Sequence, residues 1–256
     1  MLAELREVEG AIVVIFNPAI AAATRAAAQE RCDRIKAAEG VLGFVCQLFE
    51  GSSVPEVRFW CLQTIEEILN YKYATLSPSE RTGLQQWLSN LACCATTSAA
   101  GHAFLHNKLA QVYAILIRHD YCEHWLTPFT ALLNHLQMGE DVIAMFLRVL
   151  RAVDAEIINA ECHRSPADAG VAMRVKDSLR EQCIGDIAAA WYLILHEFHQ
   201  SNIALVKECL ACMALFINWI DVQLIVNDKF VPAFYSLLDK DEFVQERLIQ
   251  ALSRLY

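Results

Sequence analysis

Glycine and proline are scarce in this sequence, with nine glycines and six prolines among 256 residues. There is also no Gly/Ser-rich linker and no low-complexity tract, so the chain offers no flexible hinge between independent modules. A hydrophobic content of 55% is ample for a substantial core. Together these features favour one continuous folded array over separate modules.

Positive charge is also in short supply. The chain has 21 Lys and Arg against 30 Asp and Glu, a formal net charge of -9 and a pI near 5.4. This balance disfavours general attraction to a polyanion, so any contact with nucleic acid is expected at a local patch. The start of the chain lacks the basic residues of a signal peptide, and the uncharged run 209–220 is shorter than the roughly 20 residues that span a bilayer. We therefore expect a soluble, intracellular protein without membrane insertion.

The motifs of several large enzyme classes are missing: the sequence contains no GxGxxG, GxxxxGK[ST], HExxH or GxSxG pattern. Two cysteines could be considered as nucleophiles, Cys122 near His119 and His124, and Cys162 beside His163. Neither is predicted to lie on a glycine-rich or strained turn that would expose a reactive thiol. The sequence therefore predicts a protein that is not an enzyme.

Ten cysteines raise the questions of disulfides and of metal. Cysteines such as Cys61 lie in apolar helical stretches, where a free thiol acts as a small hydrophobic group, and this favours a reducing compartment. His196 and His199, followed by Cys209 and Cys212, would supply enough ligands for a tetrahedral zinc site. We favour core packing and no metal, because both cysteines of this set belong to an apolar row.

Apolar residues recur at helical spacing along most of the chain, and most clearly in residues 179–230. There Val206, Leu210 and Met213 form one row at steps of four and three, while Cys209 and Cys212 belong to a second row beside it. A helix with two adjacent apolar rows is buried on two sides and needs neighbours both beside it and across from it. Residues 222–239 read as the next helix after almost no linker. The pattern thus predicts antiparallel helix pairs stacked on one another.

Several helix starts can be placed. Pro18 would open an alanine-rich helix that stops at Gly40, with 41–51 as its partner, and Ser77-Pro78-Ser79-Glu80 has the pattern of a capping box. An extra amphipathic segment is expected at residues 173–183. First helices of successive pairs are expected near residues 55, 103, 140, 202 and 240. Their spacing is irregular but clusters near the 40 to 47 residues of HEAT repeats.

We therefore predict an all-α fold: a HEAT-type α-solenoid, a right-handed superhelix of about five to six antiparallel helix pairs. Residues 1–16 are ambiguous between a short helix and an apolar strand and stay unassigned, whereas residues 17–256 are assigned to the repeat array. The last predicted helix keeps an apolar stripe and has no capping signal. Because solenoids end in repeats with a polar outer face, we expect the chain to be the front part of a longer protein.

Lys176 and Arg180 are the candidates for a charged contact with a partner. Together with Arg174 they have the spacing of one helical face, and Asp177 and Glu181 alternate in sign beside them. The plainer interpretation is a solvated face laced with salt bridges. The alternative is a contact for phosphates or for an acidic partner surface. The five tryptophans are spread one per helical segment, which favours core packing over base stacking.

Four blocks of the sequence resemble one family. They are VRFWCLQTIEEILNYKYATLSPSER, FLHNKLAQVYAILIRHDYCEHWLTPF, LREQCIGDIAAAWYLIL and FINWIDVQLIVNDKF. The second block is similar to a segment of exportins in general. The other three, in this order, resemble the N-terminal part of the exportin-T family of tRNA exportins, within the importin-β (karyopherin) superfamily. The similarity covers about residues 17–256, and Gly185 stands where the family is expected to have proline.

The resemblance implies a nuclear export receptor for tRNA. Such a receptor binds Ran-GTP through its N-terminal HEAT repeats, holds tRNA on its concave surface and releases both in the cytoplasm on GTP hydrolysis. The nucleotide is carried by Ran, so the receptor itself needs no cofactor. It also implies contacts with nuclear pore proteins, no binding of DNA, and shuttling between nucleus and cytoplasm. The competing hypothesis is a HEAT-repeat scaffold for protein interactions without a role in transport.

Overall fold

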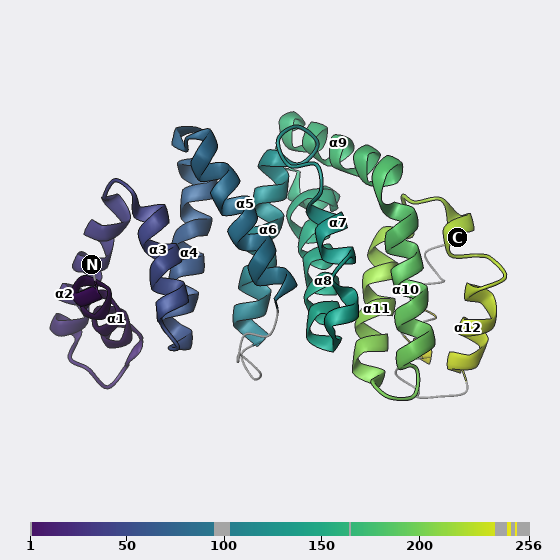
Figure 1. Ribbon diagram of the computed structural model, residues 1–256, viewed down its shortest axis with the longest axis horizontal. Helices are drawn as coiled ribbons and strands as arrows, with labels where there is room; N and C mark the ends of the chain where they lie inside the picture. Colours follow the sequence, from purple (N-terminus) through teal and green to yellow (C-terminus); the bar gives the residue numbers. More distant parts are fainter. Residues whose placement is uncertain (1, 95–102, 164, 239–244, 247–248, 250–256) are drawn as a thin grey trace. The chain divides into compact units, whose positions relative to one another are not determined.

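The computed structural model describes residues 2–94, 103–163 and 165–238, together with residues 245, 246 and 249. Within these residues every regular element is helical, and the only strand-like pairing is the isolated bridge between Tyr121 and Trp125. Helices pack chiefly against close neighbours along the chain (Figure 1). The predicted all-α solenoid is thereby confirmed. No helix in the described part of the chain is both long enough and apolar enough to traverse a lipid bilayer.

The helices have the following bounds: α1 Leu2–Phe16, α2 Ala22–Ala37, α3 Val41–Gly51, α4 Pro55–Tyr71, α5 Pro78–Cys93, α6 Ala103–Asp120, α7 Pro128–Leu133, α8 Glu140–Val153, α9 Pro166–Gln182, α10 Ile184–Phe198, α11 Ile203–Phe216 and α12 Phe230–Leu238. The chain divides into two compact units. Unit 1 comprises Met1–Leu84 and Ser98–Ile115, and unit 2 comprises Gln85–Thr97 and Leu116–Tyr256. The division falls within α5 and α6.

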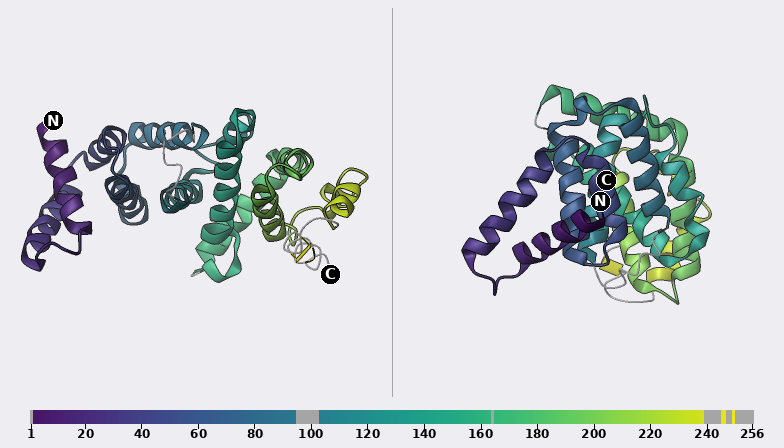
Figure 2. Two further views of the ribbon diagram at one scale, coloured as in Figure 1. Left: turned by 90° about the horizontal axis from the view of Figure 1, so that it is seen from below. Right: turned by 60° about the vertical axis from the view of Figure 1, so that its left-hand side comes forward.

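In unit 1, α1 packs against both α2 and α4, and α3 packs against α4 (Figures 1 and 2). The segment that the sequence left unassigned is therefore a helix, and its Val8 and Ile12 are buried on one face. The main partner of α2 is α1, not α3 as the sequence had predicted. The assignment of residues 17–256 to one array stays a prediction.

Helix α2 begins four residues later than predicted. Pro18 was expected in its first turn, but the side chain of Asn17 accepts a hydrogen bond from the backbone N–H of Ala19 at 3.0 Å. This local turn competes with helical bonding, so the helix starts at Ala22.

In unit 2, α11 packs against both α8 and α10 (Figure 1). Its two predicted apolar rows are buried, including Cys209, Cys212 and Met213. The ring of Phe216 meets the ring of Trp191 from α10 edge-on, with 5.6 Å between the centroids. The prediction of a helix with neighbours on two sides is confirmed.

The segment after α11 differs from the prediction of an immediate further helix. Residues between Ile217 and Lys229 form turns and one 3-10 segment, and α12 begins only at Phe230. The Asp221 side chain accepts a hydrogen bond from the N–H of Gln223 at 2.9 Å, and the Asn227 side chain accepts one from the N–H of Phe230 at 3.2 Å. Side chains of this kind offer the backbone an alternative to helical bonds. The helix predicted near residue 240 lies largely outside the described residues.

The predicted capping box at the start of α5 is confirmed. The N–H of Glu80 donates to the Ser77 hydroxyl at 3.3 Å, and the N–H of Ser77 donates to Glu80 Oε2 at 2.8 Å. The Ser77 hydroxyl also donates to the same carboxylate oxygen at 2.7 Å. These hydrogen bonds favour the charged form and lower the pKa of Glu80 from its ordinary value.

We predict that Glu80→Gln removes a pH dependence of the start of α5 while keeping its cap. Because the folded-state pKa of Glu80 is lowered, the carboxylate stabilises the fold above its ordinary pKa, and this contribution is lost as the pH falls through the lowered pKa. Gln at the same position can still accept the Ser77 N–H bond. Hydrogen exchange of residues 79–82 should therefore be slower in the wild type than in the variant at about pH 7, and this difference should be smaller at about pH 3.

Ser77→Ala serves as the matched comparison, because it removes the N-cap oxygen at every pH and should cost about 1 kcal/mol. A difference between wild type and Glu80→Gln that is the same at both pH values would contradict the assigned role of the carboxylate.

Candidate partner interface

Helix α9 carries the two predicted contact residues, and its start is set by a local cap. The Ser165 hydroxyl accepts a hydrogen bond from the N–H of Asp168 at 3.2 Å and donates to the Asp168 carboxylate at 2.8 Å, with Pro166 at the first helical position. The helix is therefore longer than the segment 173–183 that the sequence predicted. Its Val175 and Leu179 are buried, which directs the intervening charged residues toward solvent.

Arg180 is occupied by contacts within the chain. Its Nε and Nη2 donate to the backbone carbonyl of Trp219 at 2.9 and 2.7 Å, and its Nη1 donates to Asp177 at 2.8 Å. The guanidinium carbon lies 5.5 Å from the centre of the Trp219 ring. This two-point contact joins α9 to the turn that follows α11. The hypothesis that Arg180 itself touches a partner stays a prediction, but the structure gives the side chain an internal role.

Lys176 has a different position. It lies one helical turn before Arg180, and its Nζ stands 5.9 Å from the centre of the same Trp219 ring. Among the described residues Lys176 has no carboxylate partner. Within the described part of the chain, the contact of its ammonium group is the cation–π contact with the Trp219 ring. Of the two predicted residues, Lys176 is partly buried, whereas Arg180 is exposed and paired with Asp177.

Trp219 is the member of this site that the sequence did not find. The tryptophans were assigned to the core, which is correct for the buried Trp60, Trp125 and Trp191. Trp219 is only half-buried, and its ring contacts Phe216 at 5.1 Å between centroids. Because α11 ends at Phe216, Trp219 lies on a turn and its backbone carbonyl is free to accept from Arg180.

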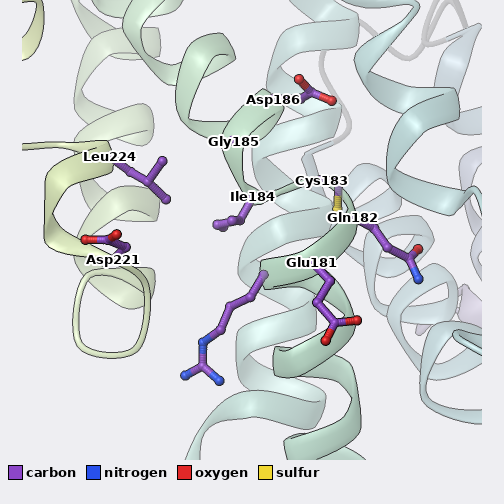
Figure 3. A pocket seen from close by; sticks show the side chains of 9 residues that line it. Glu181, Gln182, Cys183, Ile184, Gly185, Asp186, Asp221 and Leu224 are labelled. Carbon is purple, nitrogen blue, oxygen red and sulfur yellow. The ribbon is translucent and has the colours of Figure 1, made fainter.

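A hollow of about 490 Å³ lies beside this cluster, where α9 meets α10 (Figure 3). Ile184 and Leu224 point toward one another in this view, and Asp221 lies close to Leu224 (Figure 3). The hollow is lined by Arg180, Glu181, Gln182, Cys183, Ile184, Gly185, Asp186, Asp221 and Leu224. The lining combines apolar side chains with charges of both signs, so it is not a dedicated anion site.

Cys183, which lines this hollow, has a thiol of low reactivity. Burial raises the pKa of the Cys183 thiol to about 11, which keeps it protonated at neutral pH. Nothing lies within 4 Å of the position that a Cβ of Gly185 would take. No close contact therefore requires glycine at position 185. The residue lies in the first turn of α10.

The described part of the chain contains no arrangement of side chains that would support the zinc hypothesis. No group of three or more His, Cys, Asp and Glu side chains there is placed to hold a metal ion. Cys209 and Cys212 are fully buried, and burial raises the pKa of both thiols. The Cys209 thiol donates to the backbone carbonyl of Trp191 at 3.8 Å, whereas His196 is exposed. Both cysteines are thus packed within the core of unit 2.

The prediction that Cys122 does not lie on a strained turn is wrong. The sequence predicted no strained turn there, but the residue has a φ of 77°, in the left-handed region that non-glycine residues rarely adopt. The turn is held because the carbonyl of Asp120 accepts from the N–H groups of His124 and Trp125, both at 2.9 Å. The Cys122 thiol donates to the backbone carbonyl of Arg174 at 3.8 Å. The thiol is therefore engaged with α9.

Comparison with known proteins shows the family to which the chain belongs. The family model described as "Exportin 1-like protein" matches residues 102–252. The chain belongs to the exportin 1-like family. Within that family it is 37% identical to Exportin-T of Arabidopsis thaliana over 243 residues, which covers 92% of this chain and 25% of the relative. It is 34% identical to Exportin-T of Dictyostelium discoideum over 232 residues, which covers 91% of this chain and 21% of the relative.

These matches confirm the resemblance to exportin-T drawn from the four sequence blocks. The chain spans about a quarter of the length of these relatives. Among solved structures, a designed armadillo repeat protein in complex with the peptide (KR)4 covers 98% of this chain and 100% of its own, with 14% identity. Its TM-score of 0.42 is too low to support a conclusion. Lys176, Arg180 and Trp219 all lie within the part that matches the exportin 1-like family.

We predict that Arg180→Lys loosens the turn after α11 without loosening α11 itself. A lysine cannot make the two parallel hydrogen bonds to the Trp219 carbonyl, so opening of this turn should become about tenfold more frequent, a cost of about 1.4 kcal/mol. Hydrogen exchange of residues 218–222 measures this change. Lys176→Gln is the matched control, because it removes a charge from the same helix face and leaves the hydrogen bonds in place. Equal exchange in the two variants would show that Arg180 is not the tie.

Proposed function

We propose that this chain is the Ran-binding and tRNA-contacting part of a nuclear export receptor. It binds Ran-GTP through its HEAT repeats, contributes to holding tRNA on a concave surface, and releases both in the cytoplasm when GTP is hydrolysed. The observation that carries the proposal is the match of residues 102–252 to the exportin 1-like family, together with relatives named Exportin-T that cover more than nine tenths of the chain. The receptor moves between nucleus and cytoplasm and contacts nuclear pore proteins on its way.

The mechanism is binding, with no chemical step on this chain. Stacked helix pairs present many side chains to a partner, and each helix pair depends on its neighbours for its position. Ordering of the repeats by Ran would lower the cost of ordering them for tRNA, and by linkage tRNA would strengthen the binding of Ran by the same factor. GTP is bound by Ran, and hydrolysis of this GTP converts Ran from the form that the repeats bind to the GDP form.

The charges of the chain support local contacts rather than broad attraction of tRNA. With a net charge of -9, the chain cannot rely on a general positive field. Several of its cations are already paired within the chain, such as Arg151 with Glu208 and Arg180 with Asp177. We assign Lys176 as a contact for phosphate and Arg180 as the residue that holds the supporting Trp219 turn in place.

The test of the proposal is a titration of the chain with Ran loaded with a non-hydrolysable GTP analogue, with Ran-GDP as the control. We expect binding of the GTP form to be at least tenfold tighter than binding of the GDP form, about 1.4 kcal/mol. Addition of tRNA should tighten the binding of Ran further, as linkage requires. Equal binding of both forms, or none, would leave the alternative function, a HEAT-repeat scaffold without a transport role.

A second measurement tests Lys176. If its ammonium contacts a phosphate, Lys176→Gln should weaken the binding of tRNA in the presence of Ran and lower the slope of log affinity against log salt by about 0.7 to 0.9. Lys176→Glu should weaken it further. Lys229→Gln is the matched control, since Lys229 is an exposed lysine of unit 2 on a different segment. The same salt slope in Lys176→Gln and wild type would remove Lys176 from the interface.

A further inference from the structure

Helix α4 holds a lysine of α2 between an aromatic ring and a carboxylate. The Nζ of Lys36 lies 2.8 and 2.9 Å from the two carboxylate oxygens of Glu67, and 5.4 Å from the centre of the Trp60 ring. The backbone carbonyl of Lys36 also accepts a hydrogen bond from Nζ of Lys72 at 3.1 Å. The side chain of Lys36 thereby joins α2 to α4, and its backbone carbonyl joins α2 to the residue that follows α4. We call this set of residues the α2 clamp.

The same arrangement occurs toward α6. The Nζ of Lys108 forms an ion pair with Glu66 and lies 5.9 Å from the centre of the Phe59 ring. It also donates to the side-chain oxygen of Gln111 at 3.0 Å. We call this set the α6 clamp. It uses the residues of α4 that immediately precede those of the α2 clamp.

The spacing along α4 explains why two clamps form back to back. In each clamp the carboxylate follows the aromatic residue by seven positions, which is two helical turns, so both lie on one face. The pairs Phe59–Trp60 and Glu66–Glu67 are adjacent in sequence, and adjacent residues of a helix point about 100° apart. One residue of each pair therefore serves α6 and the other serves α2.

The two clamps differ in how deeply they are buried. The side chains of Lys108 and Glu66 are 13% and 19% exposed, whereas those of Lys36 and Glu67 are 19% and 39% exposed. Water and salt reach the carboxylate of the α2 clamp more easily, so its Coulomb attraction is screened more strongly.

Helices α2 and α6 differ even more in how much apolar surface they bury. Helix α6 buries apolar residues such as Leu105, Leu109 and Val112. Helix α2 buries one residue along its whole length, Cys32, and consists largely of alanine and charged residues. A second ion pair, Arg31 with Glu7 at 2.6 Å, joins α2 to α1. The side-chain contact of α2 with α4 is therefore mainly ionic, whereas α6 also meets α4 through the rings of Phe104 and Phe59, 5.7 Å apart between centroids.

We propose that the two clamps form an ionic lock in unit 1 that salt opens on one side only. Raised ionic strength weakens the exposed ion pairs of α2 and leaves apolar contacts intact, so α2 leaves α4 while α6 stays in place. Opening uncovers the ring of Trp60, which is 4% exposed in the closed state. The first repeats can thus change their spacing without loss of the core. The inference requires no partner and does not depend on the proposed role in export.

The test is hydrogen exchange of the 256-residue chain at about 0.05 M and about 1 M NaCl, where the Debye length falls from roughly 14 to 3 Å. We expect the amides of residues 26–37 in α2 to exchange at least fivefold faster at high salt. The amides of residues 107–115 in α6 should change less than twofold. Unchanged exchange of α2, or equal acceleration of both helices, would overturn the proposal.

Variants test the α2 clamp itself. Lys36→Gln should reproduce the fast exchange of α2 at low salt and reduce its response to salt, because its main ion pair with α4 is gone. Exchanging the charges in Lys36→Glu with Glu67→Lys should restore at least part of the slow exchange at low salt. The matched control is Lys229→Gln, which removes a lysine charge in unit 2 and should behave as the wild type. A Lys36→Gln variant with the wild-type response to salt would overturn the proposal.

Fluorescence provides an independent measurement of the opened state. Salt should shift the tryptophan emission of the wild type to longer wavelength as Trp60 becomes hydrated, and this shift should be absent in Trp60→Phe. A shift of the same size in Trp60→Phe would mean that another tryptophan reports it, and that α2 does not open from α4.

Discussion

The burial of helices on two sides is the constraint on which the rest of the structure depends. Helix α11 shows it most clearly, because its apolar rows contact α8 and α10 and leave little polar surface. Such a helix has no stable position alone and takes its place from its neighbours. Within each unit the chain therefore satisfies its hydrophobic surface by adding a further helix, and a binding surface on these helices has its geometry set by the packing behind it.

Polar side chains then decide where each helix begins and how its turns are held. Ser77 and Ser165 cap α5 and α9, each by accepting a backbone N–H bond. Arg180 performs the complementary task by donating to the carbonyl of Trp219 beyond the end of α11. Much of the chain's limited positive charge is thus engaged within the fold. Lys176 is among the described cations that have no carboxylate partner.

The candidate site was only partly readable from the sequence. Lys176 and Arg180 stood out because charged residues at helical spacing are expected to face solvent beside a buried stripe; in the structure Arg180 is exposed and Lys176 is partly buried. The role of Arg180 could not be read, since its partner is a backbone carbonyl 39 residues further along the chain. Trp219 was assigned to the core together with the other tryptophans, and only the end of the helix at Phe216 moves it onto a turn.

Local spacing in the chain was enough to predict the helical class, the capping box, the buried faces of α11 and the resemblance to exportin-T. These features depend on residues within a few turns of one another, where the backbone geometry is known in advance. The folded arrangement alone decided that α1 pairs with α2, that Arg180 reaches Trp219, and that α4 binds one lysine on each side. Each of these contacts joins residues from separate elements, and which separate elements meet follows from how whole helices pack and not from their local pattern.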